Sequence, residues 1–183
     1  MEDDRKVPVK IHVCCGRKVL DGWTNVDVVA SPKAPHPPEI LASALEIPLP
    51  DGCADEIMCI HGFEHLHRWE APKALIEWHR LLKPSGLLVL EMPDGRKCAK
   101  NLLRLAETED LKSLDALAMW GLYGSPLEED PFMTHRWAWW PKSLRKLLKE
   151  HGFGDFKEPE TQWHPIGRRL RDFRIEARKR ASA

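Results

Sequence analysis

The sequence lacks an excess of charge of either sign, and it has no long apolar run. Lys and Arg together number 28, as do Asp and Glu, so the formal net charge is zero. A neutral chain has no overall field that would attract nucleic acid, which argues against a nucleic-acid partner. The longest apolar runs, such as residues 86–90, fall far short of the roughly 18 residues that cross a bilayer. We therefore expect no membrane span.

Cysteine does not occur in the arrangements that form disulfide networks or zinc ribbons. There are five cysteines, Cys14 and Cys15 are adjacent, and no Cys-x-x-Cys pair is present. Both a disulfide framework and a zinc ribbon are therefore excluded. Residues 1–6 are mostly charged and no apolar stretch follows them, unlike a secretory signal. The sequence predicts reduced thiols and a cytoplasmic location.

Tyrosine is nearly absent, with one residue, whereas tryptophan is abundant, with eight. Residues 119–140 contain four of the tryptophans, Trp120, Trp137, Trp139 and Trp140. Glycines and prolines interrupt this segment and prevent a continuous helix. Long irregular segments in compact domains are usually functional. We expect residues 1–183 to form one domain, in which residues 119–140 are a lid or an acceptor-binding insertion.

Strand and helix signals mostly alternate along the chain. Apolar patterning predicts strands at residues 9–14, 24–29, 40–42, 54–60, 86–92 and 172–178. Helical periodicity, with helix starts and stops, predicts helices at residues 72–82, 97–107, 110–120 and 141–151. This order predicts an α/β fold with a largely parallel sheet and an antiparallel C-terminal strand. Nine residues separate Cys14 from Thr24, too few for a full crossover helix.

Three groups of residues follow predicted strands, where ligands of parallel α/β sheets bind. Cys14, Cys15 and Gly16 follow the first strand, Asp27 lies near the end of the second, and residues 61–65 follow the fourth. A glycine turn lets a ligand approach the backbone, and an acid on the next strand can accept both hydroxyls of a ribose. The combination indicates a nucleoside ligand.

Several segments in order resemble one enzyme family over roughly residues 9–179. They are "VKIHVCCGRKVLDGWTNVDV", "IPLPDGCADEIMCIHGFEHL", "ALIEWHRLLKPSGLLVLEMPD" and "LRKLLKEHGF" followed by "RRLRDFRIEARK". This order is similar to the class I S-adenosylmethionine-dependent methyltransferases, in particular the compact methyltransferase type 11 family. The resemblance implies a Rossmann-like, doubly wound sheet. It also implies methyl transfer from S-adenosyl-L-methionine to an acceptor, which we expect to be a small molecule.

The resemblance also implies which residues bind the cofactor. The turn formed by Cys14, Cys15 and Gly16 would contact its methionine part, and Asp27, with Val28 beside it, would hold the ribose. The adenine would be flanked by Ser43, Ala44 and Leu45, and His61 would line the pocket. Cys14 replaces a glycine of the family pattern, and Ser43 replaces an acid. These departures leave open a catalytically inactive binding protein.

Methyl transfer needs a general base only when the acceptor must lose a proton. His61 and His65 follow the fourth strand, and Asp94 follows the fifth. Our first candidate for the base is His65, with Asp94 next and His61 as a further candidate. Each of them can instead be a polar loop or capping residue.

A zinc-dependent hydrolase is the competing prediction. His61-x-x-Glu64-His65 matches the inverted zinc-protease pattern, in which two histidines on a helix bind zinc and a glutamate activates water. Gly62 lies inside the required helix, and the motif directly follows a strand, where this fold requires a loop. We therefore expect no bound metal at this pattern.

Overall fold

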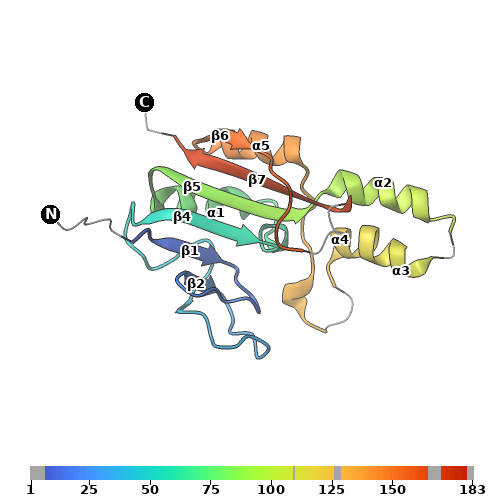
Figure 1. The fold of residues 1–183 in the computed structure, drawn as a ribbon, viewed down its shortest axis with the longest axis horizontal. Coiled ribbons are helices and arrows are strands. Elements are labelled where there is room, and N and C mark those ends of the chain that lie inside the picture. Colours follow the sequence, from blue (N-terminus) through green and yellow to red (C-terminus); the bar gives the residue numbers. More distant parts are fainter. Residues whose placement is uncertain (1–6, 109, 126–128, 165–169, 181–183) are drawn as a thin grey trace.

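The structure is a computed structural model that describes residues 7–108, 110–125, 129–164 and 170–180. Its centre is a seven-stranded sheet in the order β3-β2-β1-β4-β5-β7-β6 (Figure 1). The strands are β1 Lys10–Val13, β2 Thr24–Asp27, β3 Ile40–Leu41, β4 Ala54–Ile60, β5 Leu82–Pro93, β6 Phe153–Lys157 and β7 Asp172–Lys179. The helices are α1 Ala71–Leu81, α2 Gly95–Leu105, α3 Leu111–Leu114, α4 Trp120–Tyr123 and α5 Pro141–Glu150.

The pairing confirms the predicted mixed sheet. β1 pairs in parallel with β2 and β4, β2 with β3, and β4 with β5. β7 is antiparallel to both β5 and β6, as predicted for the C-terminal strand. The sequence analysis missed β6, and it began the fifth strand at residue 86, whereas β5 begins at Leu82 and passes through an irregular register with Ser85 at φ 61°.

The two faces of the sheet are covered differently. On one face α1 and α5 bury a large core that includes Trp78, Leu144 and Leu148, and Figure 1 shows both helices behind the sheet. On the other face Met58, Ile60 and Val89 form a smaller cluster. Within the described ranges, this second cluster is covered by loop residues, Leu20, Trp23 and Trp163, and by no helix.

The connection between β1 and β2 contains no helix, as its length predicts. Asn25 is fully buried in β2 and binds this connection through two hydrogen bonds. Its Oδ1 accepts the Leu20 N–H at 2.8 Å, and its Nδ2 donates to the Leu20 carbonyl at 3.1 Å. An amide side chain therefore replaces the packing that a crossover helix would provide. This leaves residues 14–16 as a short turn directly above the sheet edge.

Beyond the carboxyl end of β5, α2, α3 and α4 form a helical projection (Figure 1). The helix predicted at residues 110–120 is present, with a π-helical turn at Asp115–Met119 between α3 and α4. α4 stops at Gly124, whose φ of 92° suits glycine. None of the helices in the described part of the chain is long and apolar enough to cross a bilayer.

Candidate functional site

The turn after β1 has the backbone expected of a ligand-binding turn. Cys14 and Gly16 both have left-handed φ angles, 56° and 55°. The Gly16 N–H donates to Oδ2 of Asp27 at 2.8 Å, which joins the ends of β1 and β2. A Cβ placed on Gly16 would meet no atom within 4 Å, so the space beside its backbone is open. The structure therefore brings Gly16 and Asp27 together, and their role in cofactor binding stays a prediction.

Asp27 is half-buried at the end of β2, and backbone groups hold its carboxylate. Oδ1 accepts the Val29 N–H at 3.3 Å, while Oδ2 accepts from Gly16. A carboxylate offers about four lone-pair positions, so two positions remain for further donors. Val28 and Leu41, at the ends of β2 and β3, are 55% and 63% exposed. The carboxylate thus has apolar neighbours along the same edge of the sheet.

The Cys14 side chain is directed toward the β4 side of this turn. A Cβ built on Gly62 would lie 2.4 Å from the Cys14 Cβ and 2.8 Å from the Cys59 Sγ. The neighbouring Cys14 thiol and burial raise the pKa of Cys59 well above its ordinary value. Cys14, Cys59 and Gly62 are therefore packed together. Cys14, which stands where the family pattern has a glycine, packs its side chain against Gly62 and Cys59.

Residues 43–45 turn sharply after β3. The Ser43 Oγ accepts the Leu45 N–H at 3.2 Å, and the Ala44 carbonyl accepts the Trp78 indole N–H at 3.0 Å. Ser43 is exposed, whereas the Ala44 side chain is buried in the core. Of these three predicted adenine neighbours, Ser43 and Leu45 have side chains accessible from outside, and Ala44 can contribute its backbone.

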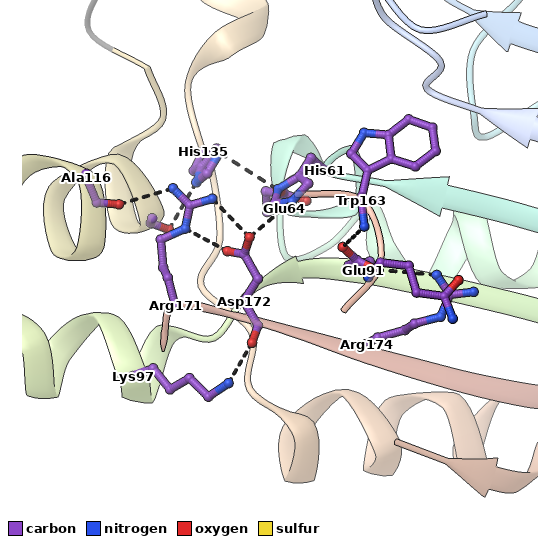
Figure 2. Close-up of polar contacts among 12 residues, drawn as sticks. His61, Glu64, Glu91, Lys97, Ala116, His135, Trp163, Arg171, Asp172 and Arg174 are labelled. Atoms are coloured by element: carbon purple, nitrogen blue, oxygen red, sulfur yellow. Dashed lines mark hydrogen bonds and ion pairs between the residues drawn. The ribbon is translucent and has the colours of Figure 1, made fainter. Parts of the chain in front are cut away.

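His61 is half-buried and lies between two acids. Its Nδ1 lies 3.2 Å from Oε1 of Glu64, and its Nε2 lies 3.5 Å from Oδ2 of Asp172 (Figure 2). Burial lowers the pKa of His61, but the two carboxylates outweigh burial and raise it to about 9. Glu64 shows the opposite balance: burial raises its pKa, and the bond to His61 brings it down to about 2. The raised pKa favours the protonated form of His61, and its role as a candidate base stays a prediction.

The sequence analysis missed Asp172, which completes this network. Its carboxylate accepts Arg171 Nε at 2.6 Å and Nη2 at 3.1 Å, and the pair is buried. Burial raises the pKa of Asp172, while His61 and Arg171 lower it to about 2. The available signal was an Arg-Asp pair at the start of a strand in which charged and apolar residues alternate.

Glu91 is a second missed residue, inside an apolar strand. It is fully buried and accepts the backbone N–H groups of Gln162 and Trp163, both at 3.0 Å (Figure 2). Arg174 Nη1 also lies 3.3 Å from Oε2 of Glu91. Glu91 therefore anchors the segment that covers the second face of the sheet. A lone acid in the run "GLLVLEMP" is the only sequence signal of this role.

The other two candidates for a base differ in accessibility. His65 is half-buried, and its Nδ1 lies 3.1 Å from the Thr134 carbonyl oxygen. Asp94 is buried and caps α2, since its Oδ1 accepts the N–H groups of Arg96 and Lys97 at 2.9 and 3.3 Å. The structure brings His61 and His65 onto one turn, and it places Asp94 at the start of α2. Of these two, His65 is the more exposed.

The zinc-protease pattern lacks its helix. Residues Phe63–His65 form a single 3-10 turn that follows His61, whose φ is 49°. The ligand atoms of His61 and His65 fall into two separate clusters, one with His164 and Asp172 and the other with Glu64 and His135. The two histidines of the motif therefore do not form the pair that an inverted zinc protease requires.

The tryptophan-rich segment has both buried and exposed members. Trp139 is 2% exposed and packs against Phe63, with ring centroids 5.5 Å apart. Trp137 is 42% exposed, with the Arg68 guanidinium 6.0 Å from its ring. Residues 126–128 of the expected insertion lie outside the described residues. Trp139 is thus a core residue, whereas Trp137 is the most exposed of the four tryptophans.

The sheet order defines a Rossmann-like fold, and the Gly16–Asp27 pair lies at the carboxyl ends of two of its adjacent parallel strands. Residues 18–90 match the model of the family described as "Methyltransferase domain". A probable S-adenosylmethionine-dependent methyltransferase of Mycobacterium tuberculosis is 30% identical over 138 residues, which cover 67% of this chain and 50% of that protein. The chain therefore spans about half the length of the first curated relatives it matches.

Two solved structures share the fold at low sequence identity. A SAM-dependent methyltransferase from Archaeoglobus fulgidus superimposes with a TM-score of 0.63 at 17% identity, covering 95% of this chain and 87% of that one. A Burkholderia thailandensis 1,6-didemethyltoxoflavin-N1-methyltransferase, solved with bound 1,6-didemethyltoxoflavin and S-adenosylhomocysteine, gives a TM-score of 0.58 at 16% identity over 95% and 72%. The sequence match thus places a methyltransferase domain at residues 18–90, and the chain has the Rossmann-like fold of class I S-adenosylmethionine-dependent methyltransferases.

Proposed function

We propose that this chain transfers the methyl group of S-adenosylmethionine to a small-molecule acceptor. The observation that carries the proposal is the 2.8 Å bond between Gly16 N–H and Asp27 Oδ2 at the ends of adjacent parallel strands. This bond orients the carboxylate and keeps an open backbone turn beside it. A ribose requires the oriented carboxylate, and the methionine part of the cofactor requires the open turn.

The residues of this edge suit the cofactor. Asp27 keeps two lone-pair positions for ribose hydroxyls, and the exposed Val28 and Leu41 offer apolar contacts to the adenine. The open side of Gly16 leaves space for the methionine part. Cys14 packs against Gly62, which is evidence against its crowding this space.

When bound, the cofactor supplies an electrophilic methyl group with a good leaving group. The protein's contribution is then to orient the acceptor and exclude water. His61, half-buried between Glu64 and Asp172, is suited to holding the loop after β4 together. An acceptor that must lose a proton would find the Nε2 of His65, because the Nδ1 of that ring faces the Thr134 carbonyl. Asp94 is the second candidate, and Trp137 is suited to form an acceptor wall.

Calorimetric titration with S-adenosylhomocysteine tests the proposal. Asp27→Ala should weaken binding about a hundredfold if the lost hydroxyl bonds net about 2.7 kcal/mol. Asp27→Asn should cost less, because the amide oxygen still accepts. Asp21→Ala removes an exposed acid of the same connection and is the matched control.

Thermal melts of the three variants check that the fold survives. Equal affinity in wild type, Asp27→Ala and Asp27→Asn would contradict the proposed site. Binding without release of S-adenosylhomocysteine from S-adenosylmethionine, over a panel of hydroxyl, amine and thiol acceptors, would instead support an inactive binding protein.

A further inference from the structure

One cluster of side chains has no role in cofactor binding. Glu64, His65 and His135 each place a ligand atom so that all three atoms lie within 4.8 Å of one another. Glu64 and His65 lie on the turn after β4, and His135 comes from the tryptophan-rich segment. We propose that these three residues bind one divalent transition-metal ion, and we take Zn²⁺ as its representative. The inference does not depend on the proposed methyl transfer.

Both imidazoles are oriented as metal ligands usually are. The Nδ1 of His65 lies 3.1 Å from the Thr134 carbonyl oxygen, and the Nδ1 of His135 lies 3.1 Å from the Gly121 carbonyl oxygen. A carbonyl oxygen only accepts, so each Nδ1 carries the hydrogen and each Nε2 keeps its lone pair. Metal-binding histidines typically donate their other N–H in this way, which sets the tautomer. The two rings are nearly perpendicular, with centroids 4.7 Å apart.

Glu64 supplies the anionic ligand. Its side chain is 3% exposed, and Oε2 has no hydrogen-bond partner among the described residues. An unsatisfied buried carboxylate oxygen is unfavourable, and a metal ion would satisfy it. Oε1 lies 3.8 Å from the Nε2 of His135, so the carboxylate is already beside one of the two imidazole ligands.

Main-chain bonds hold the cluster together without an ion. The Glu64 carbonyl accepts the N–H groups of Arg136 and Trp137 at 2.9 and 3.2 Å. This fixes the segment next to His135 against the turn that carries Glu64 and His65. His65 is half-buried, so the ion can enter from its side. A preformed site of this kind loses little conformational entropy when it binds.

The ligand types select the metal. Two imidazole nitrogens and one carboxylate suit Zn²⁺ and neighbouring first-row ions, whereas Mg²⁺ and Ca²⁺ prefer oxygen ligands. The cluster of His61, His164 and Asp172 is less suited, because both nitrogens of His61 lie against carboxylates, as in a protonated ring. The site therefore differs from the motif that the sequence suggested, since His135 takes the place of His61.

Occupancy would link the loop after β4 to the tryptophan-rich segment. It would also withdraw the Nε2 of His65 from proton transfer, so metal binding and a general-base role of His65 exclude each other. Titration of Zn²⁺ into the protein without cofactor separates this inference from the proposed function. Failure of S-adenosylhomocysteine to bind would leave the zinc result unaffected.

The test is calorimetric titration of the full chain with Zn²⁺, and with Mg²⁺ as a second probe. We expect one equivalent of Zn²⁺ and no measurable Mg²⁺ binding. His65→Gln and His135→Gln should each weaken Zn²⁺ binding by at least about 10- to 100-fold. Loss of a residue that only hydrogen-bonds to a metal ligand already weakens binding by this much. His67→Gln, a nearby histidine stacked on Trp69, is the matched control and should bind like wild type.

Co²⁺ absorption spectra of the same proteins report whether nitrogen ligands are lost. If His135→Gln does not fold, the half-buried His65 position decides the question. Equal Zn²⁺ affinity in wild type and His65→Gln, or the absence of binding by wild type, would overturn the inference. So would an equal loss of affinity in His67→Gln.

Discussion

Gly62 lies where the turn after β1 approaches the turn after β4. Its φ of −133° is open to any residue, so the requirement for glycine is one of space and not of backbone conformation. Cys14 on the other side does adopt a left-handed φ, which is unfavourable for a residue with a Cβ by about 1–2 kcal/mol. The family pattern has a glycine at the position of Cys14. Here the close approach is made possible by Gly62.

Gly62→Ala should therefore displace the turn that carries Gly16. Its Cβ would lie 2.4 Å from the Cys14 Cβ, and overpacking of this kind costs about 1–3 kcal/mol. We expect a lower urea midpoint and weaker S-adenosylhomocysteine binding. Adding Cys14→Gly to Gly62→Ala removes the opposing Cβ and should recover part of both losses. Urea midpoints of Gly62→Ala and the double variant that equal the wild-type value would show that the two turns are not in contact.

At the scale of elements, the segment that includes residues 129–140 is divided between core and surface. Its backbone is attached to Glu64, and Trp139 packs into the core beside Phe63. Trp137 lies partly in solvent beside Arg68. A segment held in this way can still present one aromatic face to a ligand. The lid or acceptor-binding role expected for residues 119–140 stays a prediction.

Two substitutions separate these roles. Trp139→Ala should lower the free energy of unfolding by about 3–5 kcal/mol, as expected for removal of a large core side chain. Trp137→Ala should change it by about 0.5 kcal/mol or less. Urea denaturation measures both, and the fluorine resonance of 5-fluorotryptophan at position 137 should shift when S-adenosylhomocysteine or an acceptor binds. A ligand-insensitive resonance at position 137, or equal stability losses, would contradict this division.

At the scale of the molecule, the net charge is zero, but several charged side chains are buried in the interior. His61, Glu64 and Asp172 lie within one network, and Arg171 extends it to the Ala116 carbonyl at 3.3 Å. His12, on the thinly covered face of the sheet, behaves oppositely. Burial lowers its pKa to about 4, so this histidine favours the neutral form in the folded state.

The stability of the fold should therefore be greatest near neutral pH. The pKa of His61 is raised to about 9, so its contribution is complete below the unfolded value near 6.5 and is lost as the pH rises through 9. His12 reduces stability as the pH falls from 6.5 toward 4. The lowered pKa values of Glu64 and Asp172 reduce it further as the pH falls from their unfolded values through about 2.

His61→Gln tests the alkaline part of this profile. Wild type should lose up to about 3 kcal/mol between pH 6.5 and 9, and the variant should lose much less. Urea titrations at several pH values measure the slope. His67→Gln, outside the network, should retain the wild-type slope. An alkaline loss in His61→Gln as large as in wild type would assign the pH dependence to other groups.

The sequence by itself determined the elements that have local signals. Apolar patterning and turn residues located β1, β2, β4, α1 and α5 to within a few residues, because burial on one face and chain reversal are properties of neighbouring residues. The positions of Gly16 and Asp27 followed, since parallel strands present their carboxyl ends at one edge. β6 was missed because its five residues include Gly154, and Asp155 with φ 51°, and pair irregularly with β7.

Only the tertiary structure decided which charged residues meet. Asp172 reaches His61, His135 reaches Glu64, and Glu91 anchors residues 162 and 163, all across long separations in sequence. It also decided that Cys14 packs against Gly62, that Trp139 is core, and that one face of the sheet is covered by loops. A carboxylate or an imidazole has similar local propensities whether it is solvated, paired or ready to bind a ligand. Its role is set by the desolvation and the partners that the packed chain imposes.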